Sequence, residues 1–150
     1  MKNKRSVVIA FIALFFILFV TCAYSNTLSE AQTHRKQAEE YFQKHDIDKA
    51  LEHLKKAIEY GDKSSSAYAL VATMYRLKGM NDEARQYYTA ALEAAEKELA
   101  FTKALVPKPG EDAQAIQEKI DKLVLDREYN VLLIKKSIKE LESAVSVPTK

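Results

Sequence analysis

The chain has 150 residues, of which 47% are hydrophobic and 29% charged, and its formal net charge is +2. This length is typical of one domain, and the near-neutral charge excludes a polybasic nucleic-acid-binding protein. Three Gly and three Pro residues are too few for an all-β domain with many tight turns, and a single Cys excludes a disulfide framework or a cysteine-rich zinc site, so we expect a small all-α domain.

Residues 1–25 have the pattern of an export signal. Three of the first five residues are basic, and residues 7–20 are unbroken hydrophobes. As a helix, residues 7–23 would be about 26 Å long, slightly short of a hydrocarbon core of about 30 Å. Residues 1–23 hold three of the 23 basic residues and none of the 21 acidic ones, so the rest of the chain is slightly acidic.

Three fates of this N-terminal segment stay open. A signal peptide would be cleaved after Ala23 or Ser25, where small residues occupy the positions that define such a site. An uncleaved segment would anchor the chain in the membrane. Cys22 stands where a bacterial lipoprotein carries its lipidated cysteine, although Thr21 precedes it where that motif has Gly, Ala or Ser. Each fate exports the remainder, to the bacterial periplasm or the outer face of the inner membrane.

Helices are predicted throughout residues 26–106, because apolar residues recur there every three to four positions. N-cap residue types and two glycines divide this region. The four predicted helices cover residues 29–44, 47–60, about 66–79, and 81–106.

A turn at residues 107–110 and one long helix at 111–145 complete the prediction, with residues 146–150 as a tail. If the last two helices pair symmetrically about the turn, Asp82 lies opposite Ile134. Residues 135–144 would then extend beyond the fourth helix. We expect Ile138 and Leu141 of that extension to dock near the Gly79 turn or on a partner.

The two halves of this helical region match at an offset of 34 residues. The matched pairs are Ala38 and Ala72, Tyr41 and Tyr75, Lys44 and Lys78, Asp48 and Asp82, Ala50 and Ala84, Leu54 and Tyr88, Ala57 and Ala91, and Ile58 and Leu92. This period and pattern resemble the tetratricopeptide repeat (TPR) family, with repeats at 31–64 and 65–98. Two departures concern the family's Trp, replaced by His34 and Tyr68, and its closing Pro, replaced by Asp62 and Glu96. The alternative is a generic four-helix bundle with an accidental period.

The resemblance implies two helix pairs followed by a long antiparallel helical hairpin that caps them. It also implies a concave groove, lined by the first helix of each pair, that binds a protein or peptide partner. The residues carried over to this groove are Gln32, Arg35, Glu39 and Phe42 from the first repeat, and Ala69, Thr73 and Arg76 from the second. The Lys and Asn clamp with which some family members hold a C-terminal carboxylate is not supported here.

The long last helix offers a second candidate surface, because it is apolar on more than one side. Its candidate contact residues are Val124, Leu125, Leu132, Leu133, Ile138 and Leu141. We expect the first four to pack against the repeats, the alternative being contact with another protein.

No catalytic constellation is recognisable. His34, His45 and His53 lack metal-ligand spacing, and no phosphate-binding loop or nucleophile elbow occurs. We therefore expect no enzyme, no metal, no cofactor and no nucleic-acid partner. Two functions remain: an exported, non-catalytic interaction adaptor or assembly scaffold, or a structural protein whose last helix drives self-association into a homo-oligomer.

Overall fold

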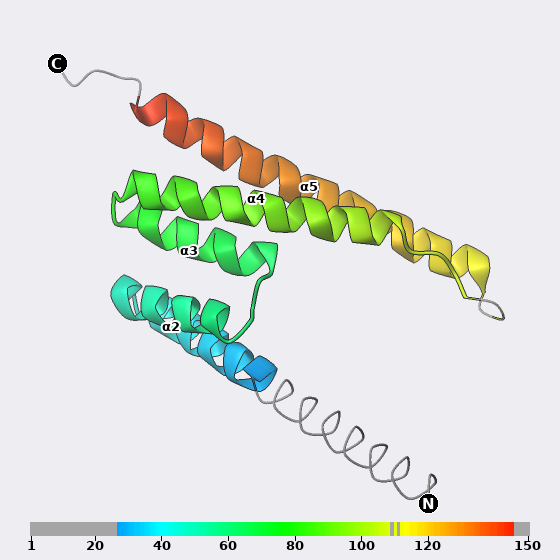
Figure 1. The fold of residues 1–150 in the computed structure, drawn as a ribbon, viewed down its shortest axis with the longest axis horizontal. Helices are drawn as coiled ribbons and strands as arrows, with labels where there is room; N and C mark the ends of the chain where they lie inside the picture. The colour runs from blue at the N-terminus through cyan, green and yellow to red at the C-terminus, as the bar shows by residue number, and fades with distance from the viewer. Residues whose placement is uncertain (1–26, 109, 111, 146–150) are drawn as a thin grey trace, which may run out of the picture.

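The computed structural model describes residues 27–108, 110 and 112–145 (Figure 1). Cys22 and the rest of the predicted N-terminal segment lie outside this range, as does the tail at 146–150. The described residues form helices and no strand, which confirms the all-α prediction. The helices cover residues 27–43 (the first helix), α2 Ile47–Glu59, α3 Ser65–Leu77, α4 Asn81–Lys103 and α5 Ala113–Val145. None of the described helices is long and apolar enough to cross a membrane.

The helices form a row in chain order. The first helix lies beside α2, α3 packs on both α2 and α4, and α5 runs along α4 in the opposite direction (Figure 1). Each described helix therefore contacts mainly its neighbours in sequence. The first helix and α2 lie at one end of this row and α5 lies at the other.

The turn after the first helix and the turn after α3 share one backbone geometry. His45 and Gly79 both have left-handed φ angles, of 60° and 74°. In each turn the next N–H group donates to the carbonyl oxygen five residues earlier at 3.0 Å: from Asp46 to Tyr41, and from Met80 to Tyr75. This bond belongs to the Schellman motif, which ends a helix at a left-handed residue. The two turns are therefore equivalent at the offset of 34 residues that relates the sequences.

Small side chains line the contacts between neighbouring helices. Six matched alanines are at most 2% exposed: Ala38, Ala50, Ala57, Ala72, Ala84 and Ala91. Because their side chains end at Cβ, the helix backbones can approach closely. Leu54 and Tyr88 fill the space around them, and Val131, Ile134 and Leu141 extend the same core from α5.

The register of α5 against α4 differs from the symmetric one. Lys103, the last residue of α4, pairs with Glu128 at 2.7 Å, and Glu96 pairs with Lys135 at 3.0 Å. A symmetric hairpin would place Glu96 opposite Ile120. The expected overhang is therefore wrong: the first turns of α5, not residues 135–144, extend past α4 (Figure 1).

The segment between the two helices explains this shift. The helix α4 ends at Lys103 and α5 begins at Ala113, so the connection is longer than the predicted turn at 107–110. Extended chain advances about 3.3 Å per residue, whereas a helix advances about 1.5 Å. The connection therefore carries the chain well past Lys103 before α5 begins. Leu141 consequently lies in the core rather than on an extension.

Candidate functional site

A groove of about 380 Å³ lies between α3 and α5, with α4 contributing to its lining. Three of the sequence-predicted groove residues line it: Ala69, Thr73 and Arg76. The remaining lining residues come from α4 and α5: Tyr88, Asn130, Leu133, Ile134, Lys136, Ser137 and Glu140. The last helix thus forms one wall of the groove, a role that the sequence analysis did not assign to it.

The groove has hydroxyl groups at its middle and charged side chains at one end. The Thr73 hydroxyl donates to the Ala69 carbonyl at 2.8 Å and accepts from the Tyr88 hydroxyl at 3.1 Å. At the C-terminal end of α3, Glu140 lies between two cations, 3.4 Å from Arg76 and 3.9 Å from Lys136. These exposed charges can exchange partners at small cost, because solvent-exposed ion pairs contribute about 0–1 kcal/mol each.

The groove candidates of the first repeat lie elsewhere. Glu39 and Phe42 border a separate hollow of about 40 Å³, which Leu70 and Met74 of α3 also line. Gln32 is exposed on the first helix. The structure therefore brings together the candidates from α3 but not those from the first helix.

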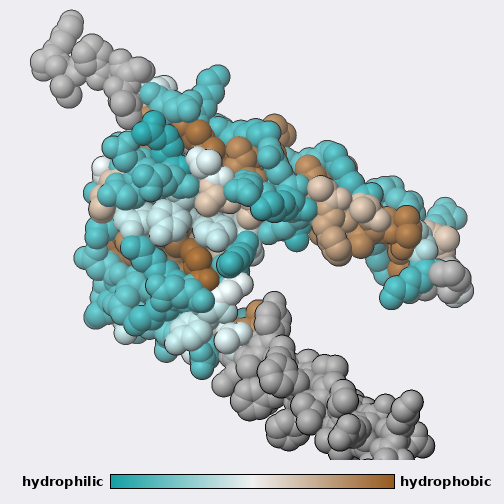
Figure 2. Space-filling model, in the orientation of Figure 1, coloured by the Kyte–Doolittle hydropathy of each residue, from teal (hydrophilic) through white to brown (hydrophobic). Residues whose placement is uncertain are grey.

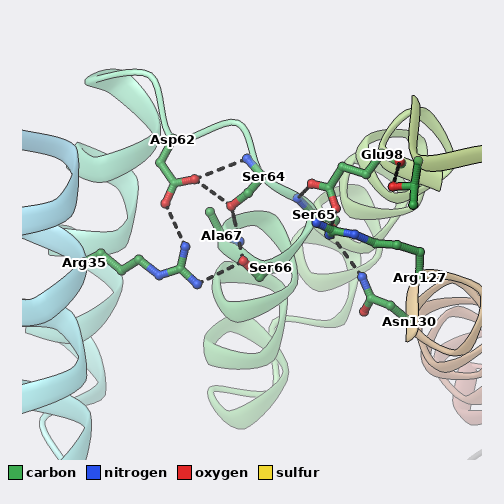
Figure 3. Close-up of polar contacts among 10 residues, drawn as sticks. Arg35, Asp62, Ser64, Ser65, Ser66, Ala67, Glu98, Arg127 and Asn130 are labelled. Atoms are coloured by element: carbon green, nitrogen blue, oxygen red, sulfur yellow. Dashed lines mark hydrogen bonds and ion pairs between the residues drawn. The ribbon is translucent and has the colours of Figure 1, made fainter. Parts of the chain in front are cut away.

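Arg35 makes structural contacts at the N-terminal end of α3 (Figure 3). Its guanidinium lies 3.2 Å from the Asp62 carboxylate and donates to the Ser66 hydroxyl at 2.9 Å. The other Asp62 oxygen accepts from the Ser64 N–H and hydroxyl groups, at 3.2 and 2.6 Å. Ser64 in turn caps α3 by accepting from the Ala67 N–H at 3.2 Å. Arg35 was carried over to the partner groove, but its guanidinium contacts Asp62 and Ser66 and does not line the groove between α3 and α5.

Glu98 joins three helices on the other side of the same helix end (Figure 3). Its carboxylate accepts from the Ser65 N–H and hydroxyl groups, both at 2.8 Å, and forms an ion pair with Arg127 of α5. Asn130 of α5 donates to the Ser65 hydroxyl at 3.1 Å. The carboxylate satisfies an N–H group that has no partner inside α3 and interacts favourably with the helix dipole. Glu98 thus fixes α5, and with it one wall of the groove.

Sequence reasoning missed Glu98, although one signal was available. Arg127 occupies the apolar stripe of the last helix, between Leu123 and Val131. A charged residue on a helix face that otherwise packs against the protein needs an acidic or polar partner there. The sequence alone could not say which of the nearby acidic residues is that partner.

Four aromatic rings stack between the first helix and α2. The Nδ1 atoms of His34 and His53 lie 3.0 Å apart, so one ring donates and the other accepts. Tyr60 stacks on His34, and Tyr41 stacks on His53, each with ring centroids 5.3 Å apart. His34 and His53, which lack metal-ligand spacing in the sequence, thus form a contact between two helices.

The pKa of His53 is lowered from its usual range. Burial is the main cause, and the neighbouring His34 and Lys56 add to it, while Glu52 opposes them. Because the hydrogen bond between the two rings needs at least one unprotonated nitrogen, protonating both histidines would break it.

The groove is identified as a candidate binding site from the geometry of its lining residues. Within the described parts of the chain, no group of three or more His, Cys, Asp and Glu side chains could hold a metal ion. No family model matches the chain, and no curated protein matches it either.

Proposed function

We propose that this chain is an exported TPR-like adaptor that holds an extended segment of a partner protein in the groove between α3 and α5. The observation that carries the proposal is the groove itself, where Ala69, Thr73 and Arg76 lie together. These are the residues that the family resemblance assigns to peptide contact in the second repeat. In this proposal the chain performs no catalysis and serves to hold partners in an assembly in the cell envelope.

The equivalent turns and buried alanines support the TPR-like interpretation of the first four helices. In a TPR array the helix after the second repeat would be the first helix of a third one, and it would line the same groove. We infer that α5 takes this position, since it packs on α4 and lines the groove beside α3. A single long helix would then replace the third repeat and cover the core of the second, as terminal caps do in repeat proteins.

The groove's chemistry favours a partner with both apolar and charged side chains. Leu133 and Ala69 provide apolar contact at the end of the groove beside Asn130. Arg76 and Lys136 could each exchange the shared Glu140 carboxylate for an acidic side chain of the partner. Such a groove suits transient binding of an extended segment, because most of its energy comes from a few apolar contacts.

Site-specific photo-cross-linking tests this proposal in the cells that make the protein. A photoreactive amino acid at Ser137, inside the groove, should attach a partner protein, while the same amino acid at Thr89 on the exposed side of α4 should not. The substitution Leu133→Arg should abolish the Ser137 adduct, because the long charged side chain fills the apolar part of the groove beside Ala69. Leu77→Arg adds the same charge to an exposed leucine outside the groove and should leave the adduct intact.

Two results would contradict the proposal. One is an identical set of adducts from Ser137 and Thr89, which would mean that the groove has no preferred partner. The other is a Ser137 adduct that still forms in the Leu133→Arg variant, provided that this variant keeps the helical circular dichroism of the parent chain.

A further inference from the structure

The helix α5 has a second apolar stripe on its solvent-exposed side. Leu125, Tyr129 and Leu132 are 69%, 63% and 64% exposed. Their spacing of four and three residues places them on one face of the helix. At about 100° per residue, this face lies opposite the one through which Ile134 and Leu141 enter the core. The expectation that Leu125 and Leu132 pack against the repeats is therefore wrong.

This stripe, formed by Leu125, Tyr129 and Leu132, lies on the end helix of the row. The first helix and α2 are at the far end, so no described helix covers the outer side of α5 (Figure 1). Figure 2 shows that apolar surface also gathers over the end of the arm formed by α4 and α5, whereas most of that face is hydrophilic. Exposed apolar residues in this region include Phe101 and Val106. A stripe of large apolar side chains on the outer side of a helix is typical of a contact with another helix.

The charged residues at the two ends of the stripe differ in net sign. Glu118 and Asp121 precede it, and Lys136 and Lys139 follow it, all four exposed. On a helical wheel these four residues lie within about 60° of the stripe's centre. Lys122 and Glu140 lie within the same angle, so the face carries two acidic residues and one basic residue before the apolar stripe, and two basic residues and one acidic residue after it.

We propose that this face binds the same face of a second copy of the chain, with the two α5 helices antiparallel and Tyr129 near the twofold axis. Leu125 of one copy then packs against Leu132 of the other, and Asp121 lies near the other copy's Lys139. A parallel pair would set each charge against its own equivalent, which costs free energy instead of gaining it.

This self-association differs from the proposed groove function, because the apolar stripe and the apolar wall of the groove use different sides of α5. The two surfaces meet at Lys136 and Glu140, which line the charged end of the groove. A dimer would leave the Ala69 and Thr73 part of each groove open, and the assembly would present two partner sites, one from each copy.

Cysteine cross-linking of the full chain tests the antiparallel pairing. In a Cys22→Ser background, Asp121→Cys and Lys139→Cys are made separately, and the two chains are co-produced with different affinity tags. A short bismaleimide should join a chain with cysteine at 121 to a chain with cysteine at 139. It should not join two chains that carry cysteine at the same position, because these lie on opposite sides of the dimer centre. Cross-links through the N-terminal segment cannot give this pattern.

A charge exchange provides the second arm. Asp121→Lys alone should reduce the dimer fraction at least fivefold, measured with cysteine at Tyr129 as the reporter. Adding Lys139→Asp should restore it, because the attraction is then recreated with the signs reversed. Leu132→Glu should abolish the Tyr129 cross-link without changing helical circular dichroism, since the side chain is exposed in the single chain.

The outcomes are decisive in both directions. Cross-linking between positions 121 and 139 only, with rescue by the charge exchange, supports the antiparallel dimer. Cross-linking between identical positions at 121 would overturn it in favour of a parallel pair. A complete absence of cross-links, or a different protein captured by cysteine at Tyr129, would overturn self-association through this face.

Discussion

Replacing Glu98 by alanine should destabilise the protein more than any other single carboxylate removal on α4. This carboxylate is the shared acceptor of the Ser65 N–H and hydroxyl groups and the partner of Arg127. The substitution removes all three interactions at once, while alanine preserves helix propensity. The free energy of unfolding should therefore report the strength of the junction itself.

The expected magnitude follows from what the substitution leaves behind. Ser65 is 1% exposed, so its N–H group has no ready access to water once the carboxylate is gone. A buried donor without an acceptor costs about 1–3 kcal/mol, and the hydroxyl adds a smaller amount because it can rotate to another acceptor. The ion pair adds less than about 1 kcal/mol, because the Glu98 and Arg127 side chains are 23% and 37% exposed. We expect a loss of about 2–4 kcal/mol in total.

Urea unfolding of residues 26–150, followed by circular dichroism, measures this loss. With an m-value of about 2 kcal/mol/M, the midpoint should fall by about 1–2 M without a change in m. Glu96→Ala is the matched control, because it removes the same residue type from the same helix. Glu96 and its partner Lys135 are both 52% exposed, so the control should change stability by less than about 1 kcal/mol.

A second readout separates the junction from a general loss of stability. Since Glu98 fixes α5 to α3, its removal should accelerate amide hydrogen exchange in α5 more than in α2. If Glu98→Ala and Glu96→Ala have equal midpoints, or if exchange rises equally in both helices, the junction does not hold α5 and the reasoning fails.

Three further predictions concern the helix contacts. The free energy of unfolding should be greatest above pH 6.5 and fall as the pH drops through the lowered pKa of His53, because the unfolded chain then binds more protons than the folded one. Urea midpoints between pH 7.5 and 5 measure this dependence. The substitution His53→Phe keeps the ring stacking and should flatten the pH profile. His45→Gly should raise stability by about 1 kcal/mol, because glycine adopts the left-handed conformation without the steric cost of a Cβ, and a lowered thermal midpoint would contradict it. Ala91→Leu should lower the free energy of unfolding by about 1–3 kcal/mol through overpacking. Arg76→Ala should change it by no more than about 0.5 kcal/mol. Equal unfolding midpoints for the two variants would refute the close helix contact at Ala91.

The helices were predictable where their ends carry a local signal. Ser64 caps α3 through its side chain, and Gly79 ends the same helix with a left-handed residue, as expected for these residue types. His45 gave no such signal, yet it adopts the same conformation. There the hydrogen bonds of the equivalent turn outweigh the unfavourable φ of a non-glycine residue.

The register of α5 and half of the candidate groove could not be predicted from sequence. Pro107 and Gly110 marked a turn but did not reveal that α4 ends at Lys103 and that α5 begins only at Ala113. The place of Arg35 depends on Asp62, 27 residues away, and that of Ser65 depends on Glu98. Such pairings between distant residues are set by the packing of whole helices, which single-sequence periodicity does not describe.

The polar contacts around the N-terminal end of α3 give the molecule one rigid edge and one compliant edge. At the rigid edge, half-buried groups join Arg35 of the first helix to Asp62 in the loop before α3, and link α3 to α4 and α5. At the opposite end of α3, the cross-helix ion pairs are Arg76 with Glu140 and Lys78 with Asp48, and these are largely solvent-exposed. Dissolved salt weakens exposed pairs far more than buried ones. Rising ionic strength should therefore let α5 pivot about the Glu98 junction, so that the groove widens at its Arg76 end while its other end keeps its width.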